Sequence, residues 1–515
     1  MNLWRSIRKI EEELSHQDSE LPSNFKRIAS QCCGVLAANS IKFTTSTFHG
    51  FHIMLIAELH KKDSEIDITL NQLTWLASLD FLVPIGSIST AFITQRVGSR
   101  LVMLWCSILY VTIWLSYSYS TSTTMLMTAQ ILYSLTRGAL KTPTSTYVTE
   151  ISEPRLRGSF LATCHLASTF GTFFSLLMGS LLYWRTVALI NIAFPIVSFI
   201  VILAIPDSPM WLASQGRLDE AEDALCWLRG WARTAVHVRS EYQSLVESFN
   251  RSSFFSTVAH DESSEQNSRK LERLRAKLKP YSQRSFYLPL ASVSLIYFIH
   301  FFSGVSAIQV YSMLIFREMD SPIHVSVATT SMGAMRIIGA LVVFLCIRLS
   351  GKRRLVFGSL LVAGGCHLVI SGVGFLLQHL PPQISPESTP YPWVSPIAMI
   401  IAVFANSSGV ETIVHMLNCE IFPLSIRYIG SAIGGSVGSV MQSIMSKAFL
   451  YMLDGLTLPG LFLYFGLMNG VAMIAYYFVF PETEGRSLKE IEEHYGGIKS
   501  LTDDDGRNER REKNI

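Results

Sequence analysis

The segment Glu150-Ile-Ser-Glu-Pro-Arg-Leu-Arg157, which follows a long apolar run, recurs in altered form as Glu420-Ile-Phe-Pro-Leu-Ser-Ile-Arg427. Both copies keep a glutamate and an arginine seven residues apart. A glycine with basic neighbours also recurs, at Gly98 and Gly351, and a proline followed by an acid ends both the sixth and the twelfth apolar run. Matched landmarks in one order indicate two duplicated halves.

Apolar runs of about 20 residues, separated by short charged loops, predict helices that cross a membrane. Of 515 residues, 49% are hydrophobic and only 16% are charged, against about 25% charged in a soluble chain. The predicted spans are near 29–57, 70–95, 101–120, 123–149, 157–183, 186–206, 286–316, 323–348, 354–378, 393–418, 427–453 and 458–480. We therefore expect an all-α integral membrane protein of twelve helices.

The polar segments divide the chain further. We expect a cytoplasmic N-terminal segment at 1–28, a first six-helix half at 29–206, a cytoplasmic helical linker domain at 207–285, a second half at 286–480 and a cytoplasmic tail at 481–515. Both termini are assigned to the cytoplasm because Lys and Arg concentrate in the loops on that side. No cleavable signal peptide is visible.

Several classes of site are not predicted. None of the eight cysteines falls in a loop expected outside the cell, so no disulfide framework is indicated. No Cys/His spacing predicts a metal site, and no phosphate-binding Gly-Lys-Ser/Thr loop is present. No nucleophile is paired with a positioned base. We expect no enzyme, no cofactor and no nucleic-acid partner.

The stretch Ile299–Tyr311 (IHFFSGVSAIQVY) opens the second half and mixes apolar residues with polar ones. Polar groups in hydrocarbon are costly unless they face a partner or a water-filled cavity, which predicts a cavity wall here. A helix–helix seam is the alternative, since Ser and Gly also collect at seams. Gly304 allows a backbone or a ligand to approach closely.

Together these motifs resemble those of the sugar porter branch of the major facilitator superfamily, and are similar to insect facilitated trehalose transporters. The resemblance covers roughly 30–495 and includes Pro206-Asp-Ser-Pro and Pro481-Glu-Thr-Glu. It implies two six-helix halves around a central site, which the halves expose alternately to the two sides of the membrane. Sugar is the substrate class that it implies.

The resemblance also implies where a substrate would bind. Positions that hold glutamine, asparagine or tryptophan in the family carry other residues here. The substrate-binding candidates are His165, His300, Phe301, Ser306, Glu411 and His415. Amides both donate and accept hydrogen bonds, which suits neutral sugar hydroxyls, so their loss weakens the expectation of a hexose. The loss of the span-10 prolines also predicts a helix without its built-in break.

Charged residues inside the spans add two expectations. Glu411 has His415 one turn later on the same face, which allows a shared proton; a structural pair is the alternative. Long basic chains near span ends reach the interface, an interpretation that covers Lys141 and extends to Arg336. A basic excess facing a cavity, with Lys42 the hardest to explain otherwise, favours an anionic substrate.

Charged residues at the cytoplasmic ends of the spans are predicted to form a gate that bridges the halves in one state and releases in the other. Simple anchoring by positive charge is the alternative. The gate candidates are Arg96, Arg100, Glu150, Arg157, Lys352, Arg353, Glu420 and Arg427.

The expected function is therefore a secondary carrier in the cell membrane for a small polar solute, either trehalose or a hexose. Protons are a candidate coupling ion, through Glu411 or Asp80. Two alternatives stay open: a carrier of an organic anion or another non-sugar solute, and a non-transporting sensor on the same fold.

Overall fold

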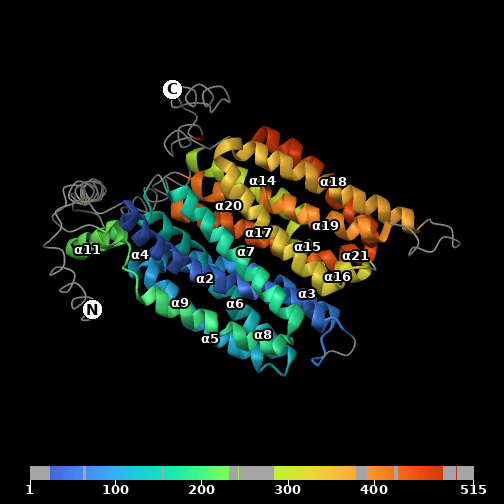
Figure 1. Cartoon of the computed structure of the whole chain (residues 1–515), viewed down its shortest axis with the longest axis horizontal. Helices are drawn as coiled ribbons and strands as arrows, with labels where there is room; N and C mark the ends of the chain where they lie inside the picture. The colour runs from blue at the N-terminus through green and yellow to red at the C-terminus, as the bar shows by residue number, and fades with distance from the viewer. Residues whose placement is uncertain are drawn as a thin grey trace, which may run out of the picture.

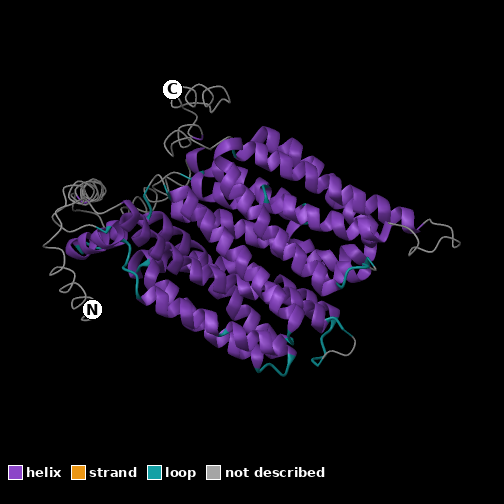
Figure 2. Ribbon diagram, in the orientation of Figure 1, coloured by secondary structure: helices purple, strands orange, loops and turns teal. Residues whose placement is uncertain are grey.

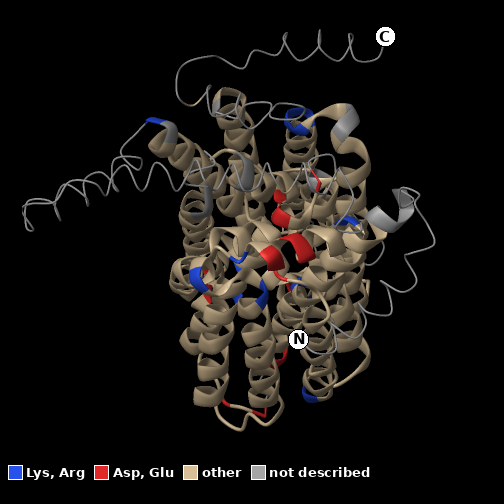
Figure 3. Cartoon of the chain, turned by 90° about the vertical axis from the view of Figure 1, so that its left-hand side faces the viewer, with Lys and Arg blue, Asp and Glu red and all other residues tan. Residues whose placement is uncertain are grey.

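The computed structural model describes residues 24–61, 65–153, 156–230, 242, 284–319, 321–378, 391–422, 427–479 and 495. Helices account for nearly all of these residues and no strand occurs among them (Figure 2). Eight of the described helical segments are long and apolar enough to cross a membrane. Their ribbons carry few charged residues (Figure 3), in keeping with the predicted membrane protein.

The first half begins with one long helix, and the helices that follow it are shorter. Its helices are α2 (Asn24–Leu59), α3 (Leu70–Ser78), η1 (Leu79–Leu82), α4 (Val83–Val97), α5 (Ser99–Ser118), α6 (Thr123–Ile151), α7 (Arg157–Leu181), α8 (Trp184–Asn191) and α9 (Ala193–Leu203). Thr69 begins α3 with a capping box to Gln72, and Ser122 caps α6 by accepting from the Met125 N–H. The short 3₁₀ turn η1 carries Asp80.

The second half follows the two short helices α10 (Pro209–Ser214) and α11 (Leu218–Arg229). Its helices are α14 (Arg284–Phe302), α15 (Val305–Val310), α16 (Ser312–Glu318), α17 (Val325–Ser350), α18 (Lys352–Gln378), α19 (Tyr391–Ser407), α20 (Val410–Glu420) and α21 (Arg427–Val479). Within α21 the backbone is non-helical at Thr457, which separates the eleventh predicted span from the twelfth. All twelve predicted spans thus coincide with helices.

The two halves lie side by side (Figure 1). Within them, α2 packs on α7 and α18 packs on α21; between them, α17 packs on α7 and α21 on α4. We call the end that carries α10 and α11 the linker end, and the opposite end, with α3 and α16, the far end (Figure 1). At the far end the halves touch again, because α15 and α16 pack on α2.

The helix α14 ends where Gly304 takes a left-handed conformation, with φ at +86°, and α15 begins. Glycine tolerates this region, whereas other residues are strained there. A Cβ at this position would lie 2.7 Å from the Phe465 ring. The close approach that was expected at Gly304 is therefore made by Phe465, and this turn re-aims the chain that carries Ser306.

The tenth span is broken after all. Helix α19 ends at Ser407 and α20 starts at Val410, with Gly409 between them at φ −156° and ψ −93°. The expectation of an unbroken helix without the prolines was wrong. A neighbouring helix stabilises the break, because Ser359 Oγ of α18 accepts a hydrogen bond from the Val410 N–H at 3.1 Å. A freed backbone donor that finds a partner on a neighbouring helix makes such a break tolerable in a membrane.

The described part of the predicted linker domain, α10 and α11, docks on the first half. Trp211 Nε1 donates to the Gln95 carbonyl at 3.1 Å. Arg229, only 4% exposed, donates through Nη1 to the Ile151 carbonyl at 3.1 Å, at the end of α6. Most of 231–283 lies outside the described residues, so the extent of the domain stays a prediction.

We expect Arg229→Met to lower the free energy of unfolding by about 1–3 kcal/mol, because the buried Ile151 carbonyl loses a charged donor. Chemical denaturation in detergent micelles measures this loss. The matched control is Arg217→Met, which removes an exposed arginine paired with Glu220 one turn away and should change stability by less than about 0.5 kcal/mol. Equal losses in the two variants would contradict the docking role.

Candidate functional site

A buried ion pair joins α17 to α20 in the second half. Arg336 donates through Nη2 to Glu411 Oε1, and Ser407 Oγ donates to Glu411 Oε2 at 2.9 Å. Arg336 is 9% exposed and Glu411 is 8% exposed. The interpretation that Arg336 extends to the membrane interface was therefore wrong. Buried charges persist only when they are paired and hydrogen-bonded, as here.

Two of the predicted histidines face this pair from different halves. His165 on α7 and His300 on α14 both lie within electrostatic range of Glu411. Each has one buried ring nitrogen, Nε2 of His165 and Nδ1 of His300, without a hydrogen-bond partner among the described residues. The predicted candidates on α7, α14 and α20 are thus brought together at the boundary between the halves.

The third histidine lies one turn further along α20. His415 Nδ1 and the Tyr297 hydroxyl are 3.1 Å apart and hydrogen-bonded, so His415 is not the direct partner of Glu411. The His415 side chain is exposed, yet it lies within electrostatic range of Lys141 in the other half.

The remaining two candidates of the second half lie close by in the chain. Phe301 and Ser306 are buried, at 5% and 7% exposure. The Phe301 ring stacks on Tyr297 with centroids 5.9 Å apart, and the His300 ring meets it edge-on at 4.8 Å. Phe301 thus packs among the rings of α14 that border His300 and His415.

The first half holds a second ion pair, which is partly buried. Arg137 on α6 donates through Nη1 to Asp80 Oδ2 on η1. His49 on α2 lies within electrostatic range of Arg137 and also of Arg336. In each half an ion pair therefore joins the second predicted span to the fourth. In the first half the acid is on the second span and the arginine on the fourth, and in the second half these positions are exchanged.

Two lysines join the halves directly. Lys141 on α6 donates to the Gly435 carbonyl at 2.8 Å on α21, so its assignment to the membrane surface was wrong. Lys447 on α21 places its ammonium 3.8 Å from the centre of the Trp75 ring and donates to Thr74 Oγ1 at 3.2 Å. The second contact ties the far ends of the halves together, since Trp75 and Thr74 belong to α3.

Two of the gate candidates, Arg100 and Arg353, contact residues of their own halves. Arg100 contacts Asp207 Oδ2 at 3.2 Å and two carbonyls at the end of α9. Arg353 donates to the Tyr477 carbonyl at 3.0 Å, while Arg96 is exposed and Lys352 is buried. The side chains of Arg157, Glu420 and Arg427 lie outside the described residues. Bridging between the halves stays a prediction.

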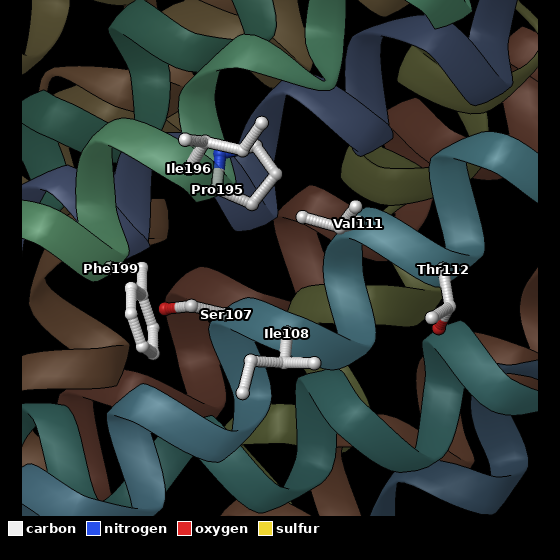
Figure 4. A pocket seen from close by; sticks show the side chains of 7 residues that line it. All are labelled: Ser107, Ile108, Val111, Thr112, Pro195, Ile196 and Phe199. Atoms are coloured by element: carbon white, nitrogen blue, oxygen red, sulfur yellow. The ribbon is translucent and has the colours of Figure 1, made fainter.

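A cavity of about 210 Å³ lies elsewhere, between α5 and α9 (Figure 4). Its lining is Ser107, Ile108, Val111, Thr112, Pro195, Ile196 and Phe199. Ile108 and Ile196 are each 46% exposed, and nearly all of the lining surface is apolar. None of the candidate polar residues borders it, so it is a feature of the outer surface of the first half.

Sequence reasoning left Arg336 and Lys141 out of the site because each was assigned to a span end. It also left out Tyr297, which is buried and bonded to His415. One signal was available for Arg336: an intramembrane acid such as Glu411 needs a partner, and α17 supplied a basic residue at mid-helix. Among the described residues, no cluster of His, Cys, Asp or Glu is arranged to hold a metal ion.

The family model described as "Sugar (and other) transporter" matches residues 43–495. A facilitated trehalose transporter, Tret1 of Apis mellifera ligustica, is 25% identical over 86% of this chain and 83% of its own. The human facilitated glucose transporter member 6 of solute carrier family 2 is 25% identical over 84% of each chain. A solved structure of the proton:xylose symporter XylE superposes with a TM-score of 0.68 at 16% identity, over 92% of this chain and 100% of that one.

The structural likeness establishes the fold, which is that of the major facilitator superfamily. The family model spans most of both halves. The chain therefore belongs to the sugar (and other) transporter family, and it is a multi-pass membrane transporter rather than an enzyme.

Proposed function

We propose that this protein carries a neutral sugar across the cell membrane by alternating access, with both termini in the cytoplasm. The substrate binds at the boundary between the halves, at His165, His300, Phe301, Ser306, Glu411 and His415. One observation carries the proposal: His165 on α7 and His300 on α14 each have a buried ring nitrogen without a partner among the described residues, and both lie within electrostatic range of Glu411. Such groups are costly unless a ligand or water satisfies them.

The charge balance of the site favours a neutral solute over an anion. Two arginines within the spans are paired with acids, Arg137 with Asp80 and Arg336 with Glu411. A carboxylate-bearing solute would have to displace Glu411 from Arg336 and approach its negative charge. The printed names of the relatives, which are trehalose, glucose and sugar transporters, point to the same class of substrate.

The contacts between the halves support a mechanism of alternating access. The far ends are joined by the Lys447 contact and by α16 on α2. On the linker side of the site His415 is exposed, and the contact between the halves described there is the bond from Lys141 to the Gly435 carbonyl. A site closed on one side and reachable from the other is one of the two states that such a carrier needs. The gate candidates of the linker end would bridge the halves in the opposite state.

Counterflow in liposomes tests the proposed function. Liposomes that contain the purified protein and are preloaded with unlabelled sugar should accumulate labelled D-glucose, D-xylose or trehalose in a saturable way. They should exchange none of a panel of organic anions. Exchange of an anion alone would establish the anion alternative. Exchange of no solute would favour the sensor, which should instead need residues 207–285 or 482–515 for a partner. Varying the pH on one side would show whether protons accompany the sugar.

The three histidines are the next test. We expect His165→Ala, His300→Ala and His415→Ala each to weaken the affinity for the exchanged sugar by about tenfold, because each removes one hydrogen bond to a hydroxyl. Affinity is measured by competition in counterflow. Unchanged affinity in all three variants would place the binding site elsewhere.

A further inference from the structure

The guanidinium of Arg336 is only partly used. Its Nη2 bonds to Glu411, but its Nε–H is buried and has no hydrogen-bond partner among the described residues. An unpaired buried donor on a charged group carries a large desolvation cost, which a hydrogen bond to a ligand or an ordered water removes. The neighbouring imidazoles of His165 and His300 carry unpartnered nitrogens as well.

The acid of the pair also has capacity left. Each carboxylate oxygen accepts up to two hydrogen bonds. Oε1 takes one from Arg336 and Oε2 takes one from Ser407. The ion pair therefore offers a free donor beside free acceptors, and its net charge is zero.

A side-chain amide has this same combination of one donor face and one acceptor face. We propose that Arg336 and Glu411 together form a substitute amide that binds one hydroxyl of the sugar. The hydroxyl accepts from Arg336 Nε–H and donates to the Glu411 carboxylate. This inference rests on the proposed function and adds Arg336 to the binding residues.

The local backbone fits this role. The break at Ser408–Gly409 starts α20 at Val410, one residue before Glu411, so the acid lies in the first turn of a new helix. Ser407, the last residue of α19, reaches across the break to the same carboxylate. The Glu411 carboxylate is thus positioned by residues of both α19 and α20. A side chain that is already fixed in place loses little conformational entropy when it binds a hydroxyl.

The experiment uses full-length protein in liposomes and the sugar that it exchanges best, together with that sugar's single-deoxy analogues. For the wild type, one analogue should bind about 10- to 100-fold more weakly than the parent sugar, since a hydrogen bond to a charged group is lost. Arg336→Lys keeps the charge but removes Nε–H. It should bind the parent sugar more weakly than the wild type does, but less weakly than the wild type binds that analogue, because the hydroxyl can still donate to Glu411. It should leave the affinity for the analogue unchanged.

Two double variants separate binding from structure. Arg336→Gln/Glu411→Gln supplies an amide donor and acceptor and should keep sugar affinity within a few-fold. Arg336→Met/Glu411→Leu replaces the pair with apolar side chains of similar size, which folded proteins often tolerate, and should lose at least tenfold in affinity. The matched control is His367→Leu/Asn469→Leu, which removes another buried polar pair of the second half, 3.3 Å apart, and should leave affinity unchanged.

The outcomes separate this inference from the proposed function. If the wild type exchanges no sugar, the proposed function fails. If it exchanges sugar but Arg336→Lys weakens the parent and every deoxy analogue equally, or weakens neither, the substitute amide is overturned while the carrier stands. Wild-type affinity in Arg336→Met/Glu411→Leu would overturn it as well.

Discussion

Replacing Glu411 alone with leucine should lower the free energy of unfolding by about 3–5 kcal/mol, because it leaves the Arg336 guanidinium buried without a counter-charge. Both side chains of this pair are only 11% exposed, so water does little to compensate the arginine. Adding Arg336→Met should recover most of the loss. Chemical denaturation in detergent micelles measures all three proteins.

The pair of the first half provides the comparison. Asp80→Leu leaves Arg137 unpaired, but the Arg137 side chain is 29% exposed, against 11% for Arg336. The loss should therefore be smaller than for Glu411→Leu. If the Glu411→Leu single variant were as stable as the double variant, Arg336 would have another source of compensation, and the pair would not hold α17 to α20.

The fold was predictable because it depends on features that repeat along the chain. Apolar length fixes where helices cross, and the duplicated landmarks at Glu150–Arg157 and Glu420–Arg427 fix the two halves. The break in the tenth span was not predictable in this way. It depends on a long-range contact, the Ser359 hydroxyl that accepts from the Val410 N–H, and local sequence without proline gave no sign of it.

The candidate site was predictable only where it depends on features visible along the chain. His165, His300 and Glu411 were found from their positions relative to the family motifs, and the structure brings them together. Partners across helices were not found. Glu411 pairs with Arg336 and His415 pairs with Tyr297, whereas the sequence placed Glu411 and His415 one turn apart and left a shared proton and a structural pair as alternatives. Neighbours on one helix face are visible in sequence, but the facing helix is not.

Gly409→Ala should disable the protein more severely than its size change indicates. A Cβ at this position would lie 2.4 Å from Ser359 Oγ and 2.6 Å from the Leu355 carbonyl oxygen. Relief requires α20 to move away from α18, because a backbone oxygen cannot rotate aside. The hydrogen bond from Val410 to Ser359 then lengthens, and Glu411 shifts relative to Arg336. We expect a loss of about 2–4 kcal/mol in stability, from overpacking and a lost hydrogen bond together.

Gly365→Ala in α18 is the matched control, since a Cβ there meets no atom within 4 Å and should stabilise the helix by about 0.5–1 kcal/mol. Denaturation in micelles and sugar counterflow are measured on both variants. If the break before α20 sets the position of Glu411, Gly409→Ala should lower sugar affinity as well as stability. A larger side chain in place of Ser359 should lower both further. Ser359→Ala should restore neither property, because the Val410 N–H stays unpaired and the Leu355 carbonyl oxygen still obstructs the added Cβ. A Gly409→Ala protein with wild-type affinity would show that the position of Glu411 is set by α17 alone.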